Sequence, residues 1–203
     1  MFVELHLSST DRRLIRLLKA LGYGLVALVI GGGNDIEEMP TFRKLVITQG
    51  SAWKIRMYKS FDLVSVIPWS RFVLNKLISD DRVDVITINE VNRNILPSKD
   101  QARVMAREGK ALEIVINPIV SNGEGGLAFL RSIINEYSAI DGLRIVVSQG
   151  IGKVSDVRNP RDVAKLIEVL ADVNAKPLIS DNPYEVVVDA CIGGVFVYEV
   201  CDN

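Results

Sequence analysis

The chain has 203 residues, of which 48% are hydrophobic and 24% are charged. This composition excludes a disordered protein and fits one well-buried globular domain over residues 1–203. We find no apolar run near the roughly 20 residues that cross a bilayer, and no basic and apolar start typical of a secretory signal. We therefore expect a cytoplasmic protein without membrane contacts.

Seven short apolar runs have the length and content of β-strands. They are residues 2–7, 24–30, 44–48, 63–67, 83–88, 111–116 and 143–147. Helical patterns lie between most of them, at residues 14–21, 70–78, 98–108 and 126–137, with Ser9 or Thr10 expected to cap the first helix. Residues 31–43 form the longest expected loop. This alternation predicts a parallel sheet covered by helices.

A parallel sheet of this kind is either an open doubly wound sheet or a closed barrel. Glu4, His6 and Glu113 alternate with apolar residues on their strands. A barrel lumen accepts such polar side chains near its rim, whereas an open sheet covered on both faces must bury them. The pattern therefore favours a TIM-barrel-like (β/α) barrel of about seven mostly parallel strands.

The segment from residue 154 to residue 183 is the most informative part of the chain. Asn159 occupies a helix N-cap position, Pro160 is the first helical residue, and Asp162 lies in the first turn. Arg158 and Arg161 are therefore expected at a helix entrance, a place suited to a phosphate group. A second helix of about two turns is expected around residues 174–176, and a third is expected to start at residues 180–183.

This segment resembles the C-terminal signature of protein component 3 of archaeal and eukaryotic ribonuclease P. The Arg-x-Pro-x-Asp helix start falls at residues 158–162, the Ala-Lys pair at residues 175–176, and the Ser-x-Asn-Pro-like turn at residues 180–183. The resemblance is weaker elsewhere, extends from the first strand to residue 183, and leaves residues 31–60 unaligned. The tail after residue 193 resembles an extra strand of longer members.

The resemblance implies a barrel related to the polymerase-and-histidinol-phosphatase barrels. It also implies a non-catalytic subunit of ribonuclease P, the enzyme that removes the 5′ leader from precursor tRNA. In that enzyme the RNA subunit uses magnesium for the cleavage. Protein component 3 works with protein component 2 to support the RNA, so the implied partners are ribonuclease P RNA, protein component 2 and, through the complex, precursor tRNA.

Charge is unevenly spread along the chain, although its formal net value is −1. Residues 41–60 contain five basic residues and no acid, and no Lys or Arg follows Lys176. Charged helix faces are often merely solvated, but this asymmetry fits a protein that contacts RNA with one surface and something else with another.

The candidate RNA-binding residues are Arg158, Arg161, Lys176, Arg93 and Lys76. Arginines at a helix start offer bidentate phosphate contacts, and Arg93 follows a strand, where barrels place function. Lys176 is expected to share a surface with the two arginines. The alternatives are a salt bridge from Arg158 to Asp156 or Asp162, and a solvated helix face for Lys76. No aromatic platform stands out, so we expect phosphate and shape contacts.

An autonomous metal-dependent phosphoesterase is the competing hypothesis, and the ligand content of the sequence argues against it. Phosphoesterases on this type of barrel hold two or three metal ions with several histidines and carboxylates, whereas this chain has one histidine, His6. Glu4 and Glu113 are expected to be neutralised by lysine or backbone donors inside the barrel. We expect no catalytic residue, no metal site and no cofactor bound by the chain itself. Gly31–Gly33 lack the lysine of a phosphate-binding loop, and Cys191 and Cys201 give no disulfide framework.

Overall fold

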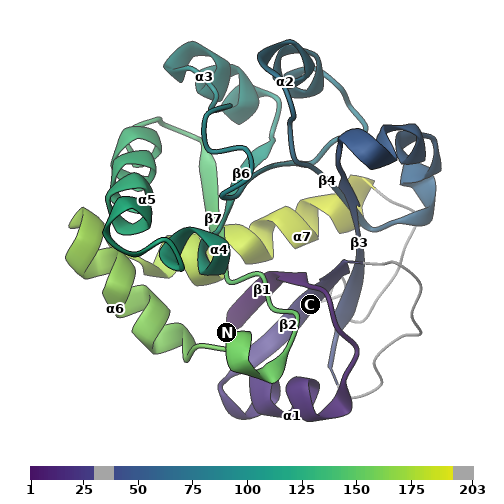
Figure 1. The fold of residues 1–203 in the computed structure, drawn as a ribbon. Coiled ribbons are helices and arrows are strands. Elements are labelled where there is room, and N and C mark those ends of the chain that lie inside the picture. The colour runs from purple at the N-terminus through teal and green to yellow at the C-terminus, as the bar shows by residue number, and fades with distance from the viewer. Residues whose placement is uncertain (30–38, 194–203) are drawn as a thin grey trace.

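The computed structural model describes residues 1–29 and 39–193 and forms a barrel of parallel strands surrounded by helices (Figure 1). The strands are β1 (Phe2–Leu7), β2 (Tyr23–Val29), β3 (Thr41–Ile47), β4 (Leu63–Val66), β5 (Val85–Ile88), β6 (Ala111–Val115) and β7 (Arg144–Ser148). Each strand pairs in parallel with the next one along the chain, giving the order β1 to β7. The predicted barrel is confirmed.

Helical segments lie between most of the strands and after the last one. They are α1 (Arg12–Ala20), the 3₁₀ segment η1 (Gln49–Ser60), α2 (Arg71–Ile78), α3 (Lys99–Arg107), α4 (Ile116–Val120), α5 (Gly123–Ser138), the 3₁₀ turn η2 (Val154–Asp156), α6 (Pro160–Ala171), the π-helical turn η3 (Pro177–Asp181) and α7 (Asn182–Gly193). Strand-to-helix alternation forces this arrangement, because a parallel neighbour is reached only by a crossover. Within the described residues, no helix is long and apolar enough to span a membrane.

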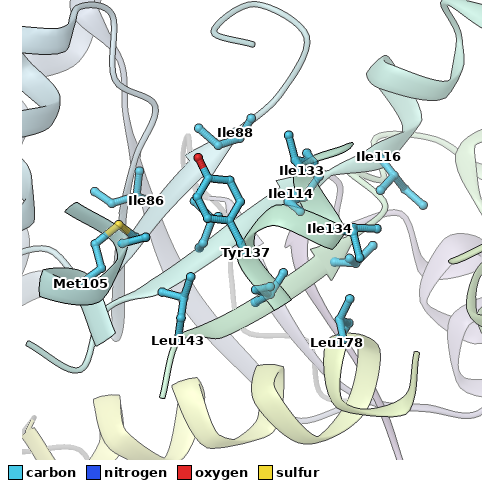
Figure 2. Packing of buried hydrophobic residues seen from close by; sticks show 14 of the residues in the cluster. Ile86, Ile88, Met105, Ile114, Ile116, Ile133, Ile134, Tyr137, Leu143 and Leu178 are labelled. Atoms are coloured by element: carbon cyan, nitrogen blue, oxygen red, sulfur yellow. The ribbon is translucent and has the colours of Figure 1, made fainter. Parts of the chain in front are cut away.

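The main hydrophobic core lies between the sheet and the helices that cover it. Tyr137 of α5 is 1% exposed, packs among isoleucines of β5 and β6, and donates its hydroxyl hydrogen to the carbonyl of Pro97 at 2.5 Å (Figure 2). Met105 of α3 and Leu178 of η3 belong to the same cluster. A second cluster fills the lumen, where Val3, Leu63 and other inward-facing residues meet Val186 and Val187 of α7.

The barrel closes along a seam between β1 and the end of β7. Near its C-terminal rim, Ser8 donates its amide to the carbonyl of Ile151 at 2.8 Å, and Ile151 donates to His6 at 2.9 Å. Further down, the Glu4 carboxylate accepts the amides of Gln149 at 2.9 Å and Gly150 at 3.4 Å. A side chain therefore takes the place of ladder hydrogen bonds along the seam.

The residues of the Ser-x-Asn-Pro-like turn close the seam at its other end. Ser180 donates its hydroxyl hydrogen to the carbonyl of Met1 at 2.6 Å, just ahead of β1. Asn182 donates its side-chain amide to the carbonyl of Ile145 in β7 at 2.8 Å. The two side chains thus join the two edge strands, which gives this part of the signature a structural role.

Several local predictions need correction. Asp11, not Ser9 or Thr10, caps α1, because its carboxylate accepts the Arg13 amide at 2.8 Å. β3 begins at residue 41, inside the expected loop, and η1 was not predicted. The two separate helices expected around residues 174–176 and from residues 180–183 are one continuous helix, since a π turn at η3 leads straight into α7. Its wider turn accommodates Pro183, which lacks the amide that an α-helix interior needs. Residues 31–34 and the tail beyond residue 193 lie outside the described residues.

Candidate nucleic-acid interface

The backbone of Arg158 is fixed by a buried glutamine. Gln149, 2% exposed at the end of β7, accepts the Arg158 amide at 2.7 Å and donates to the Arg158 carbonyl at 3.0 Å. It also donates to the Tyr23 hydroxyl. The two hydrogen bonds between Gln149 and the Arg158 backbone hold the loop after β7 against the barrel. The Arg158 side chain itself is exposed.

The Arg158 guanidinium lies over its own turn. One of its nitrogens donates to the carbonyls of Ser155 at 2.9 Å and Val157 at 3.3 Å. Within the described part of the chain it pairs with neither Asp156 nor Asp162, so the salt-bridge alternative is wrong. The Arg158 side chain is exposed, as a phosphate contact requires.

The start of α6 confirms the predicted helix entrance. Asn159 caps the helix by accepting the Arg161 amide at 2.9 Å, and Pro160 is the first helical residue. Arg161 is exposed, and Asp162 lies in the first turn. The first amides of a helix lack partners within the helix and favour negative charge. Arg158 and Arg161 therefore flank an electropositive point.

A cavity of about 440 Å³ opens beside Arg158, between α4 and α6. Its lining combines apolar side chains with polar ones, two of which are carboxylates. The lining residues are Ile116, Asn117, Val120, Ser121, Asp156, Arg158, Asp162, Val163 and Leu166. Because the carboxylates repel phosphate, an RNA backbone is expected at the outer side of Arg158 and not inside the cavity.

Lys176 does not share a surface with the two arginines. Arg158 precedes the first residue of α6, and Lys176 follows its last residue by five positions. The 12 residues of α6 separate them by about 18 Å along the helix axis. Lys176 is 73% exposed and pairs with Asp181 at 3.3 Å. The expectation of a shared surface rested on a short helix around Lys176 next to the arginines, and the 12-residue helix α6 lies between them instead.

Arg93 and Lys76 also lie at different ends of the barrel. Arg93 follows β5 at the C-terminal rim, as predicted, and pairs with Glu90 at 2.9 Å. Lys76 lies in the last turn of α2, which runs back toward the opposite rim, and its ammonium is 4.5 Å from the centre of the Phe72 ring. The five candidates are therefore distributed around the molecule.

Three basic residues near Arg158 were not among the candidates. Lys153 immediately precedes η2, and η2 packs against α1, whose first residues are Arg12 and Arg13. All three are exposed. They follow β1 or β7, so the rule that function gathers at the C-terminal ends of barrel strands was the available signal. Together with Arg158 and Arg161, they form the basic rim.

The lumen holds a buried polar cluster around Glu113. Lys44 donates to Glu113 Oε2 at 2.6 Å, Thr87 donates to the same oxygen at 2.6 Å, and Ser148 donates to Oε1 at 2.7 Å. Lys44 and Glu113 side chains are fully buried, and His6 Nδ1 lies 3.7 Å from Glu113 Oε2. The predicted neutralisation by lysine is confirmed, and Glu4 is held by backbone amides as predicted.

The pKa values of the two lumen carboxyl groups, Glu113 and Glu4, are shifted in opposite directions. Burial alone raises the pKa of Glu113, but the nearby Lys44 and His6 outweigh it and hold that pKa well below its usual value. Burial also raises the pKa of Glu4, which lacks a comparable lysine and has amide donors that only partly compensate. Among the residues whose side chains the structure describes, no three His, Cys, Asp or Glu gather as a metal site.

Comparison with known proteins assigns the family. The sequence model of RNase P subunit p30 matches residues 44–191, which is well over half of the chain. The chain belongs to the RNase P subunit p30 family. It is 24% identical over 134 residues to a ribonuclease P protein subunit of Dictyostelium discoideum, a match that covers 65% of this chain and 36% of that protein. The chain thus spans about a third of that relative's length.

The fold of the family member is shared with a chain from the cryo-EM structure of archaeal ribonuclease P with mature tRNA. The TM-score is 0.72 at 13% sequence identity, and the match covers 93% of this chain and 90% of the other. At this identity the likeness establishes the fold. It extends over residues before 44, which the family's sequence model does not match, so β1 and β2 are part of the same barrel.

Proposed function

We propose that this chain is a non-catalytic protein subunit of ribonuclease P, the endoribonuclease that removes the 5′ leader from precursor tRNA. The observation that carries the proposal is membership of the RNase P subunit p30 family over residues 44–191. The fold shared with a chain of archaeal ribonuclease P supports it. Its partners are the ribonuclease P RNA, protein component 2 and, through the complex, precursor tRNA, in the cytoplasm.

The lumen supports the non-catalytic part of this proposal. In this barrel both oxygens of Glu113 are already engaged by Lys44, Thr87 and Ser148. A carboxylate held in this way is a poor metal ligand, because binding a cation requires breaking a buried ion pair. The magnesium-dependent step belongs to the RNA subunit, and the protein itself carries no cofactor.

The basic rim is the part of the surface through which this subunit contacts RNA. Arg158 and Arg161 lie at the entrance of α6, and Lys153 and Arg12 lie beside them. Basic side chains of this kind bind phosphate groups and recognise the shape of the RNA, so the contacts do not depend on base sequence. Arg93 and Lys176 are further candidates on separate surfaces.

Reconstitution with ribonuclease P RNA and protein component 2 tests the proposal, scored by cleavage of precursor tRNA at limiting magnesium. Adding this chain raises the cleavage rate, and Arg158→Ala lowers that stimulation. Each lost phosphate contact reduces the slope of log affinity against log salt by roughly one or less. Lys165→Ala is the matched control, because Lys165 is an exposed basic residue on the same helix. No stimulation by the wild-type chain contradicts the proposed role.

A further inference from the structure

Two aromatic rings are unusually exposed on neighbouring connections of the barrel. Trp53 on η1 is 62% exposed, and Phe72 on α2 is 66% exposed. η1 leads into β4 and α2 leads out of it, so the two rings follow one another around the outside of the barrel. Exposed apolar side chains mark an interaction surface where they gather in one region, and burying these rings on folding would have stabilised the protein.

Lysine ammonium groups lie over the aromatic rings of these two elements. Lys76 Nζ is 4.5 Å from the centre of the Phe72 ring. Lys54 lies 5.9 Å from the Trp53 ring, and Lys59 lies 5.9 Å from the ring of Tyr58. The rings are thus presented together with positive charge.

Every charged side chain of η1 is basic. Lys54, Arg56 and Lys59 belong to this segment, and no Asp or Glu occurs between residues 39 and 61. A ligand that suits this surface must combine dense negative charge with flat apolar faces. Single-stranded RNA has both, because its phosphates are charged and its unpaired bases offer their faces for stacking. Duplex RNA and acidic peptides each offer one of the two.

We propose that η1 and the start of α2 bind single-stranded RNA, with bases stacked on Trp53 and Phe72 and phosphates contacted by Lys54, Arg56 and Lys59. The inference deepens the proposed ribonuclease P function and rests on it, but it concerns a surface separate from the basic rim.

Tryptophan fluorescence tests this surface directly, because the chain has two tryptophans and the other is Trp69. In a Trp69→Phe variant, emission reports Trp53 alone. Titration with a single-stranded oligouridylate quenches that emission saturably, and added salt reverses the quenching. A fully paired RNA duplex of the same length quenches it far less. Unchanged emission during oligouridylate binding, or equal quenching by the duplex, overturns the proposal.

Substitutions of Trp53 distinguish stacking of a base on an aromatic ring from contact with any apolar side chain. Trp53→Leu weakens oligouridylate binding about 5- to 150-fold, the usual effect of losing one stacked base, whereas Trp53→Phe retains most of the affinity. Val169→Ser is the matched control, since Val169 is a 71% exposed apolar residue on α6. Equal losses for the Leu and Phe variants overturn stacking. Burial of Trp53 by protein component 2 with no response to oligouridylate assigns the surface to a protein instead. Because no ribonuclease P RNA is used, these failures leave the reconstitution result unaffected.

Discussion

Replacing Lys44 with Met removes the positive charge from the barrel lumen and leaves Glu113 buried. The substitution keeps the unbranched shape of the side chain but abolishes two hydrogen bonds, to Glu113 Oε2 at 2.6 Å and to the Leu5 carbonyl at 2.8 Å. Breaking one side of a buried ion pair costs about 3–5 kcal/mol in the free energy of unfolding. For a domain of this size the thermal midpoint falls by roughly 2–4 °C per kcal/mol, so a fall of about 6–20 °C is expected.

The pH dependence of unfolding gives the sharper test. In the wild type the pKa of Glu113 is lowered by folding, so its contribution to stability is present above the unfolded value of 4.5 and is lost as pH falls. Without Lys44, burial raises that pKa instead, so the variant loses stability as pH rises through the raised value. Lowering the pH therefore decreases the contribution of Glu113 to the free energy of unfolding in the wild type and increases it in the variant.

Urea unfolding from well below pH 4 up to pH 8 measures both effects. The double variant Lys44→Met with Glu113→Gln removes the unpaired charge and recovers about 2 kcal/mol or more of the loss. Thr87 and Ser148 can still bond to the glutamine. A cost below about 1 kcal/mol for Lys44→Met, or a pH response with the wild-type sign, refutes the view that this pair is charged and buried.

Three further predictions concern function and the loop after β7. The purified chain without RNA leaves precursor tRNA intact in magnesium or manganese, and robust metal-dependent cleavage ends the non-catalytic proposal. Gln149→Ala removes both bonds to the Arg158 backbone, lowers stability by about 1–3 kcal/mol and reduces stimulation of cleavage; normal stimulation shows that the loop needs no such support. Neutralising Asp181, Glu185 and Asp189 leaves RNA affinity the same or slightly higher, because these side chains repel phosphate; a marked loss in a folded variant contradicts this.

Local signals in the sequence predicted much of the fold. The runs at β4 and β6 stand out because they are mostly apolar, as expected of parallel strands covered on both sides, and both are fully buried. The entrance of α6 was predictable because Asn159 and Pro160 act within one helical turn. The barrel was predictable because Glu113 interrupts an apolar strand, which indicates a polar lumen. In each of these cases the residues that indicate the structure lie within a few positions of the structural feature itself.

Features that depend on distant residues were not predictable. Glu113 required a basic partner, but nothing local identifies Lys44, which lies 69 positions away in the sequence. The position of Lys176 depends on the direction of α6, which the sequence pattern alone leaves open. The exposure of Trp53 depends on η1, whose 3₁₀ geometry has no clear apolar period. Tertiary packing determines all three.

The seam has a consequence for how the chain folds during synthesis. Glu4 bonds to the amide of Gln149, 145 positions later, and Ser180 bonds to Met1, 179 positions away. Strands β1 to β6 can pair in order as they leave the ribosome, but the first strand keeps an open edge until the last two helical segments emerge. An exposed edge of this kind is prone to pair with other chains. Ribosome-bound chains that end before η3 should therefore recruit chaperones, and release should follow once η3 and α7 are available to join the two edges.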